Sequence, residues 1–339
     1  MSALSDVARL AQVSKATASR ALSGNGYVSV ETRDRVVSAA ATIGYVVSST
    51  AASLVTGHTK NVGVVIPHIN RWYFGEVLEG IQSALITAGY DLTLYRISAD
   101  AAERRRVFEY FLVRKRVDAV IAVGIELTTH EVTLLHSLAK PIVGIGGPVN
   151  GIAALSIDDV AAAALVTDHL ISLGHTRIMH IGGDQHVEMD FRVHGQRLAG
   201  FRQAMRSAGL PSGNDAFRAT DISIQGGYAA GLAVLADPRT RPSAIFAGSD
   251  EVAIGTIVAA RQLGIQVPAQ LSVVGIDGHP LAPMFGLTTL AQDPHSQGTT
   301  AVKLVMDELS EPSGSPMMTW RSYPVSLEVR RSTTAPPAG

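Results

Sequence analysis

The sequence predicts an α/β protein of two lobes with parallel sheets, preceded by a small helical headpiece and a short hinge. Two observations indicate this class. Residues 61–147 and 160–277 each alternate short apolar runs with segments of helical periodicity. Residues 5–24 instead contain two short helical patterns joined by a tight turn. A chain of 339 residues is long enough for several such domains.

The first helix of the headpiece is predicted from apolar residues at helical spacing, namely Val7, Ala8, Leu10 and Ala11. Ser2 or Ser5 is its candidate cap. The turn runs through residues 12–14, where the hydroxyl of Ser14 can cap the second helix.

The second helix has an inner face of small apolar residues, Ala18, Ala21 and Leu22, which lets two helices cross closely. Its outer face carries small hydroxyls and two cations: Lys15, Ala16, Thr17, Ser19 and Arg20. Such a face suits a phosphate-lined groove and is typical of a helix-turn-helix that reads the major groove of DNA. An ordinary amphipathic helix pair on a protein surface is the alternative.

A third helix is predicted over residues 30–43, starting at Ser29 and stopping at Gly44. Its inward residues are expected to be Val36, Val37, Ala40 and Ile43. Residues 46–60 are expected to form a linker that contains one short helix. A helix of this length is only marginally stable by itself in water.

From residue 61 onward, the expected strands are short apolar runs, and helices fill the intervals between them. The first series has strands at 61–67, 90–96, 118–124 and 141–147, with helices at 74–88, 101–115 and 129–139. The second has strands at 177–183, 217–221, 243–249 and 271–277, with helices at 160–173, 191–208, 225–236 and 251–263. Helix 295–309 is expected to return to the first lobe and residues 323–332 to the second.

Composition favours a cytoplasmic, nucleoid-associated protein rather than a membrane or secreted one. Hydrophobic residues make up 46% of the chain, yet no apolar run is long enough for a membrane span, and no secretion signal is evident. The absence of cysteine excludes disulfides and thiolate metal sites. Residues 1–60 carry six Lys or Arg against three Asp or Glu, whereas the remaining chain is mildly acidic, which fits a headpiece that meets phosphate.

The sequence contains no complete enzyme motif, so we expect neither a cofactor, a metal site nor a catalytic residue. Residues 144–151 have Val149 at the last glycine position of a dinucleotide fingerprint and open no helix. His130 and His136 are too far apart in sequence for the zinc-binding helix motif.

The headpiece resembles that of the lactose-repressor (LacI/GalR) family of bacterial transcription regulators. The matching segments are Asp6-Val7-Ala8, Val13-Ser14, Ala16-Thr17, Ser19-Arg20, Val28-Ser29, Glu31-Thr32-Arg33 and Ile43-Gly44-Tyr45. The match continues to about residue 332, with the two-lobed architecture of periplasmic sugar-binding proteins. It implies a homodimer that binds a pseudo-palindromic DNA operator, with its affinity switched by a small effector between the lobes.

For DNA, the resemblance assigns contacts to both headpiece and hinge. The contacts are assigned to Ser14 and to Lys15, Ala16, Thr17, Ser19 and Arg20 of the second helix, to Tyr27 and Ser29 of the following turn, to Thr32 of the third helix, and to Ala51 and Leu54 of the hinge. Leu54 matches the side chain that wedges between base pairs in the minor groove. Gln12 stands where glycine or asparagine is usual, at a cost of about 1 kcal/mol if its backbone is left-handed.

For the effector, candidates follow the carboxyl ends of strands, where open α/β sheets bind ligands. They are Asn70, Trp72, Tyr73, Phe74, Arg192, Ser249, Asp277 and Gln292. Aromatic rings with amide, guanidinium and carboxylate partners suit a sugar or sugar derivative. Ile222 and Gly146 replace larger residues of the family, so a disaccharide is one candidate. Arg197 is the alternative to Arg192 and is expected to hold its lobe together.

These inferences combine into a domain scheme and a function. The headpiece takes residues 1–46, the hinge 47–60, the effector domain 61–333 and a tail 334–339, with 61–159 and 293–320 in the first lobe and 160–292 and 321–333 in the second. The expected function is a DNA-binding regulator, in the first instance a repressor, of carbohydrate-metabolism genes. A corepressor-dependent regulator, or one that responds to a non-sugar metabolite such as a nucleobase, is the alternative. A transport-associated sugar-binding protein and a sugar-processing enzyme are the weaker rivals.

Overall fold

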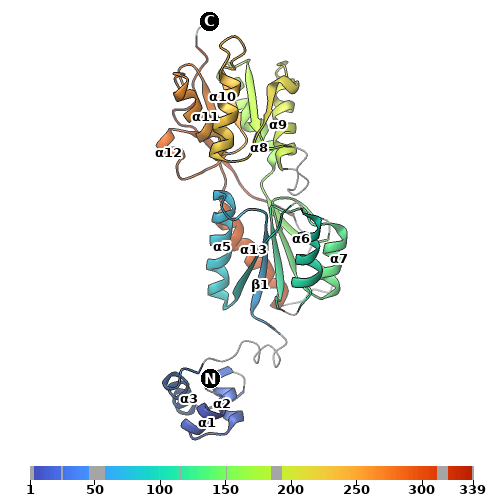
Figure 1. Cartoon of the computed structure of the whole chain (residues 1–339), viewed down its shortest axis with the longest axis vertical. Coiled ribbons are helices and arrows are strands. Elements are labelled where there is room, and N and C mark those ends of the chain that lie inside the picture. The colour runs from blue at the N-terminus through green and yellow to red at the C-terminus, as the bar shows by residue number, and fades with distance from the viewer. Residues whose placement is uncertain are drawn as a thin grey trace. The chain divides into compact units, whose positions relative to one another are not determined.

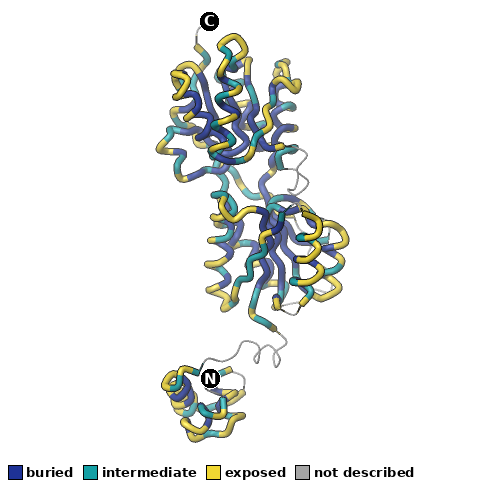
Figure 2. The backbone as a smooth tube through the Cα atoms, in the orientation of Figure 1, coloured by how far each residue is buried: buried dark blue, intermediate teal, exposed yellow. Residues whose placement is uncertain are grey.

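Figure 1 shows the computed structural model of the chain. It describes residues 4–23, 26–45, 58–98, 100–114, 116–149, 151–184, 193–310 and 320–337. Contacts divide the chain into two units, Met1–Asn61 and Val62–Gly339. Each unit has its own buried interior, drawn in dark blue in Figure 2.

Over its described residues, the first unit has three helices, α1 (Leu4–Leu10), α2 (Lys15–Ser23) and α3 (Val30–Thr42). Its core is built mostly from small side chains: Val7, Ala8, Ala11, Ala18, Ala21, Val36, Ala39 and Ala40. Alanine at these positions lets the helix axes approach closely, but it buries little apolar surface. The headpiece is therefore held together by close backbone packing and by its caps.

The caps of the headpiece confirm three sequence predictions. The Ser14 hydroxyl accepts a hydrogen bond from the Thr17 backbone N–H at 3.0 Å, and Ser29 accepts one from Thr32 at 3.4 Å. Gly44, with φ of 62°, ends α3 in the left-handed conformation that glycine adopts without steric cost. Gln12 is also left-handed, with φ of 54°, so the expected strain is present in the turn.

Three details of the headpiece differ from expectation. Val37 is half exposed rather than inward, because the buried face of α3 runs through Val36, Ala39 and Ala40. Leu10 is likewise half exposed at the end of α1. Ser5 lies inside α1 and is not its cap, and Ser2 is outside the described residues.

In the second unit, the first sheet has the strand order β11-β5-β4-β3-β1-β2. The strands are β1 (Asn61–Ile66), β2 (Asp91–Arg96), β3 (Ala119–Val123), β4 (Ile142–Ile145), β5 (Ala153–Ser156) and β11 (Trp320–Ser322). The neighbouring pairs from β1 to β11 are parallel. Alternate residues of β1 enter two different apolar clusters, Val64 in one and Val65 in the other, so helices cover both faces.

The helices of this lobe divide between those two faces. The cluster around Val64 includes residues of α5 (Trp72–Ala88) and α13 (Pro294–Ser310). The cluster around Val65 includes residues of α7 (Thr129–Ser137) and of a π-helical turn, Val107–Phe111, that directly follows α6 (Ala101–Arg106). The single helix expected over 101–115 is thus two segments, because the hydrogen-bond pattern changes at Val107.

The second sheet has the order β12-β10-β9-β8-β6-β7. Its strands are β6 (Ile178–Gly182), β7 (Phe217–Ala219), β8 (Ala244–Ala247), β9 (Ser272–Asp277), β10 (Thr288–Ala291) and β12 (Ser326–Glu328). One face is covered by α8 (Asp159–Ser172) and α9 (Val193–Ser207), the other by α10 (Ile224–Leu235) and α11 (Asp250–Gln262). The short helix α12 (Ala282–Phe285) follows β9.

Among the strands and α-helices of the described residues, four lie outside the predicted pattern: β5, β10, β11 and α12. Each has only three or four residues, and none is an apolar run that stands out from its surroundings. The strand β12 also departs from a purely parallel sheet, because it pairs antiparallel with β10. These short strands form because a neighbouring strand already offers a hydrogen-bonding edge.

The crossing of α5 and α13 depends on two glycines. A Cβ at Gly80 would lie 2.0 Å from the carbonyl oxygen of His295, and a Cβ at Gly298 would lie 2.2 Å from that of Val77. No side chain fits at such distances, so the two backbones touch directly. The crossing holds the first turn of α5 beside the first turn of α13, where polar residues of both lobes meet.

Candidate DNA-binding helix and effector site

The outer face of α2 is exposed as the sequence analysis expected. Lys15, Ala16, Ser19 and Arg20 are exposed, whereas Ala18 and Ala21 are buried on the opposite face. The stem of Arg20 lies against the turn after the helix, where a Cβ at Gly26 would be 3.2 Å from its Cδ. The hydrophobic part of Arg20 is therefore supported while its guanidinium stays at the exposed end of α2.

Four hydroxyl groups of the headpiece form two hydrogen-bonded pairs. Ser14 Oγ and Thr17 Oγ1 lie 2.8 Å apart, and the Ser29 hydroxyl donates to Thr32 Oγ1 at 2.9 Å. Both pairs sit at helix N-termini, where backbone N–H groups and the helix dipole favour an anion. Tyr27 is 93% exposed between them, so its ring makes almost no contact within the unit.

In the second unit, three of the predicted effector residues are joined by one chain of hydrogen bonds. Tyr73 Oη donates to Gln297 Oε1 at 2.9 Å, and Gln297 Nε2 donates to Gln292 Oε1 at 2.9 Å. Gln292 Nε2 then donates to Asp277 Oδ1 at 2.8 Å. We call these four residues the polar relay. It links α5, which packs on the first sheet, to the end of β9 in the second sheet.

Arg197 lies at the Asp277 end of the relay. Its Nε donates to Asp159 Oδ1 at 2.8 Å, its Nη1 donates to the Gly248 carbonyl, and its Nη2 is 3.9 Å from Asp277 Oδ1. The residue is 7% exposed, and its partners come from α8, from the end of β8 and from β9. Arg197 thus ties together three elements of its lobe, as the alternative role predicted for it requires.

Burial dominates the electrostatics of this cluster. Burial raises the pKa of Asp277 to about 6, although the Arg197 guanidinium and the Gln292 amide act in the opposite direction. Burial also raises the pKa of Tyr73, and the Asp277 carboxylate adds to that effect. Asp277 has φ of 127°, a backbone conformation that side-chain-bearing residues rarely adopt, so its carboxylate is held in place at a local cost.

Asp250 holds the end of β9 in place through hydrogen bonds. Its Oδ2 accepts hydrogen bonds from the His279 backbone N–H at 2.7 Å and from Thr289 Oγ1 at 2.9 Å. The residue has no exposed surface, and burial raises the pKa of its carboxyl group well above the usual range. Asp250 therefore positions the turn that follows Asp277, which the sequence did not indicate.

Aromatic rings lie beside the relay. The Trp72 ring is 4.8 Å from the His279 ring at an interplanar angle of 48°. Its Nε1 is buried and has no hydrogen-bond partner in the part of the chain that the structure describes. The Phe74 ring lies 5.4 Å from Tyr73 and 5.8 Å from His68. A hollow of about 320 Å³ adjoins these groups, lined by Trp72, Glu76, Gly278, Pro280, Gln292, Asp293, Pro294 and His295.

Comparison with known proteins agrees with this geometry. Residues 3–48 match the model of bacterial regulatory proteins of the lacI family, and residues 167–333 match the periplasmic binding protein-like domain. The HTH-type transcriptional repressor PurR of Vibrio parahaemolyticus is 32% identical over 321 residues, covering 92% of this chain and 93% of that protein. The chain belongs to the lacI family.

Two further lacI-family proteins extend the comparison. The ribose operon repressor of Escherichia coli is 30% identical over 319 residues, covering 92% of this chain and 94% of that protein. The solved lac repressor dimer bound to operator and the anti-inducer ONPF superposes with a TM-score of 0.86 at 24% identity, covering 98% of this chain and 99% of that one. The lacI family consists of transcriptional regulators, not enzymes, and this chain has its helix-turn-helix and its two-lobed α/β domain.

Not every effector candidate of this lacI-family regulator joins the relay. Ser249 is buried and caps α11, since its hydroxyl accepts from the Val252 N–H at 3.2 Å. Asn70 is exposed, and Phe74 packs on Gly124, where a Cβ would lie 2.6 Å from its ring. Their roles toward an effector stay predictions. Arg192, Ala51 and Leu54 lie outside the described residues.

Gln297 is the relay member that sequence reasoning missed. It has no exposed surface, and it lies one turn into α13, five residues after Gln292. The available signal was a glutamine flanked by Gly298 on the apolar face of an amphipathic helix. Such a residue needs buried partners, because an unpaired amide in the core is costly.

The described residues include neither a cluster of metal ligands nor a helix that could span a membrane. No three His, Cys, Asp or Glu side chains in those ranges are grouped as metal ligands. In the same ranges, every helix is too short or too polar to cross a lipid bilayer.

Proposed function

We propose that the protein is a cytoplasmic repressor of carbohydrate-metabolism genes that binds a pseudo-palindromic operator as a homodimer. A small sugar-like effector at the polar relay switches its affinity for the operator. The observation that carries this proposal is the relay itself, because it links residues of both lobes through hydrogen bonds at a site lined by aromatic rings. The ribose operon repressor among its relatives supports a sugar.

For DNA recognition, Arg20 and Lys15 are the side chains suited to base edges. A guanidinium forms two hydrogen bonds with guanine in the major groove, and Arg20 has the length and the exposure for it. Ala16 offers only a methyl contact. Ser14, Thr17, Ser19, Tyr27, Ser29 and Thr32 hold phosphates and set the register without reading sequence. Ala51 and Leu54 are assigned to the minor groove at the centre of the operator.

For effector binding, Asp277 and Gln292 supply acceptors and donors for hydroxyl groups, and Trp72, Tyr73 and Phe74 supply flat apolar faces. Arg192 and Ser249 complete the set that the resemblance implies, and Asn70 is its most exposed member. A ligand that hydrogen-bonds residues of both lobes stabilises the arrangement in which the lobes are close. It shifts operator binding only if it prefers one of the two states of the dimer.

A second candidate is a flat heterocycle such as a nucleobase. The observation that favours it is the pair of Trp72 and His279 rings 4.8 Å apart, beside an ionisable carboxylate. A planar ring stacks on such a pair, and Asp277 then accepts from ring N–H groups. In that case the effector could equally act as a corepressor, which strengthens operator binding rather than releasing it.

The first experiment measures binding of the full chain to DNA upstream of its own gene, with a scrambled duplex as the control. We expect sequence-selective binding that weakens in Leu54→Ala and Arg20→Ala. Equal, salt-sensitive binding to both duplexes would leave only a basic surface and overturn the regulator assignment for this DNA.

The second experiment titrates the chain calorimetrically with pentoses, hexoses, disaccharides and nucleobases. Asp277→Asn is the test variant, and Asp215→Asn, an exposed carboxylate far along the chain, is the control. One compound should bind the parent and the control but bind Asp277→Asn at least about tenfold more weakly. Binding that is equal in all three proteins would remove the effector from the relay.

A further inference from the structure

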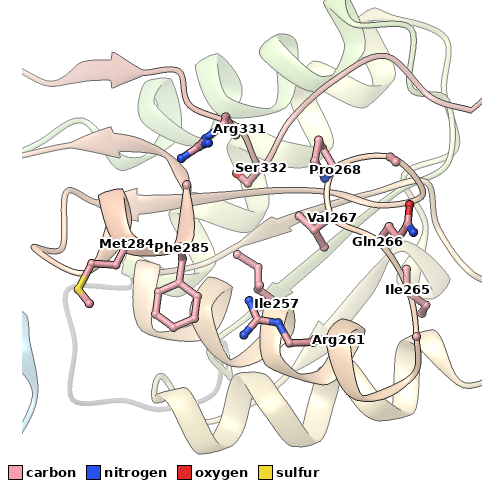
Figure 3. A pocket seen from close by; sticks show the side chains of 13 residues that line it. Ile257, Arg261, Ile265, Gln266, Val267, Pro268, Met284, Phe285, Arg331 and Ser332 are labelled. Carbon is pink, nitrogen blue, oxygen red and sulfur yellow. The ribbon is translucent and has the colours of Figure 1, made fainter.

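A larger hollow lies on the second lobe, away from the relay. Figure 3 shows it between α11, α12 and the segment after β12. Its volume is about 730 Å³, within the range typical of small-molecule sites. The residues that line it are Ile257, Arg261, Gly264, Ile265, Gln266, Val267, Pro268, Ala269, Met284, Phe285, Gly286, Arg331 and Ser332.

The floor of this hollow is apolar. Ile257 and Ile265 are almost fully buried, and Val267 and Phe285 are partly buried beside them. Met284 stands at the rim with 78% of its surface exposed. The exposed thioether and the ring of Phe285 offer adaptable contacts to a flat apolar body.

Two arginines supply the charge of the hollow. Arg261 comes from the last turn of α11, and Arg331 comes from the segment that follows β12; Figure 3 shows them on opposite sides of Ile257 and Val267. Within the described residues, neither guanidinium makes a hydrogen bond or an ion pair. None of the lining residues is acidic.

A purely structural role explains only one of the two cations. Arg261 sits at the C-terminal end of α11, where a positive charge stabilises the helix dipole. Arg331 belongs to no helix, and its stem lies on Gly286, where a Cβ would be 3.4 Å from the arginine Cβ. Two guanidinium groups that face one apolar hollow, in a chain with slightly more acidic than basic residues, point to an anionic ligand.

We infer that this hollow is a second small-molecule site and that it binds an apolar anion: a carboxylate or phosphate group on a flat hydrophobic body. Arg261 and Arg331 hold the anionic group, and Ile257, Val267 and Phe285 hold the body. The site is distinct from the relay, since Asp250 and Arg261 lie at opposite ends of α11, roughly 16 Å apart along its axis. The inference does not depend on the proposed function.

The test uses the full chain labelled with ¹³C at its methionine methyl groups and phenyl phosphate and benzoate as probes. Met284→Leu identifies the signal of the rim methionine. We expect millimolar probe to shift that signal in a saturable way. Phenol and inorganic phosphate, which each lack half of the required chemistry, should bind at least about tenfold more weakly.

The decisive variant is Arg261→Gln with Arg331→Gln. It should bind both probes at least about tenfold more weakly, whereas Arg206→Gln should bind them like the parent. Arg206 is the matched control because it is an exposed arginine in the last turn of α9. Asp277→Asn should also bind like the parent, which separates this site from the relay.

Two results would overturn the inference. One is an unchanged Met284 signal with both probes, including the case in which a second copy of the chain closes the hollow. The other is equal binding by the parent and the double variant. The signals of the other methionines show whether the double variant is folded. If it is unfolded, the single variant Arg331→Lys replaces it, and it should also bind both probes more weakly than the parent and the Arg206→Gln control.

Discussion

The headpiece and the effector domain use polar side chains in opposite ways. On α2, Lys15, Ser19 and Arg20 are exposed on an alanine-rich helix pair. In the effector domain, Arg197, Asp277 and Gln297 are buried. Arg197 bonds Asp159, whereas Asp277 and Gln297 both bond Gln292. Exposed groups can change partner without disturbing the fold, whereas buried ones cannot. A ligand at the relay is therefore coupled to the fold, and a base contact at α2 is not.

The largest expected effect comes from removing the central buried cation. Arg197→Ala leaves Asp159 buried without its ion pair, and we expect a loss of about 3–5 kcal/mol in the free energy of unfolding. Burial raises the pKa of the Asp159 carboxyl, so its charge depends on that arginine. Urea denaturation followed by circular dichroism measures the loss, with Arg206→Ala as the exposed control. A loss below about 1 kcal/mol would mean that solvent reaches Asp159 and that the relay is not buried in solution.

The second prediction concerns the crossing of α5 and α13, the helices that carry Tyr73 and Gln297 of the relay. Gly80→Ala places a methyl group against the His295 carbonyl, so we expect it to lower stability by about 1–3 kcal/mol. Gly75→Ala on the same helix meets nothing within 4 Å and should raise stability by about 0.5–1 kcal/mol. Thermal melts of the two variants should therefore move in opposite directions. A common direction would contradict the backbone contact.

The third prediction is a pH dependence of stability. The pKa of Asp277 is about 6 in the folded chain, above the ordinary value of a carboxyl group, so the folded chain keeps a proton that the unfolded chain has released. Stability should therefore fall as pH rises from the ordinary value to about 6, by about 3 kcal/mol for this group alone. Asp277→Asn should lose this part of the decline. Parallel profiles for parent and variant would assign the decline to other carboxyl groups.

The fourth prediction tests the exposed face of α2. Arg20→Ala should reduce discrimination between operator and scrambled DNA by about 1–3 kcal/mol while leaving the melting temperature unchanged, since the side chain is exposed. Arg35→Ala, an exposed arginine of α3, removes the same charge and is the control. Fluorescence anisotropy at fixed salt measures both. Equal losses of discrimination in the two variants would mean that Arg20 attracts DNA through its charge alone and does not read the sequence.

The smallest expected effect is a gain in the stability of the headpiece. Gln12 has φ of 54°, so Gln12→Gly should stabilise the headpiece by about 1 kcal/mol, whereas Gln12→Ala should not. Hydrogen exchange of the Ala18 and Ala21 amides in the full chain reports on this unit alone. Equal protection in both variants would show that the turn is not strained.

Periodicity was sufficient to predict most of the fold. The strands β1, β3, β4, β8 and β9 are apolar runs of four to six residues, and almost all of their side chains are buried. Such runs between amphipathic helices leave a parallel sheet as the consistent arrangement. The caps at Ser14, Ser29 and Gly44 were equally readable, because capping is a local hydrogen bond between residues a few positions apart.

The candidate site was predicted only in part. Tyr73, Gln292 and Asp277 were expected from their places after strands, and the structure joins them. Gln297 was missed because nothing in its helix indicates which buried partner satisfies the amide. Asp250 was not predicted, because its support of the turn at His279 depends on a contact between residues 29 positions apart.

The sequence by itself determined the headpiece, the succession of strands and helices, and the side chains available to DNA and to an effector. These depend on local periodicity, on capping and on a motif whose residues lie within one short segment. The tertiary structure decided which of those side chains meet: the relay, the crossing at Gly80 and Gly298, and the hollow with Arg261 and Arg331. Their members lie 5 to 224 positions apart within the relay alone, so only the packing of helices on sheets brings them within reach of a hydrogen bond.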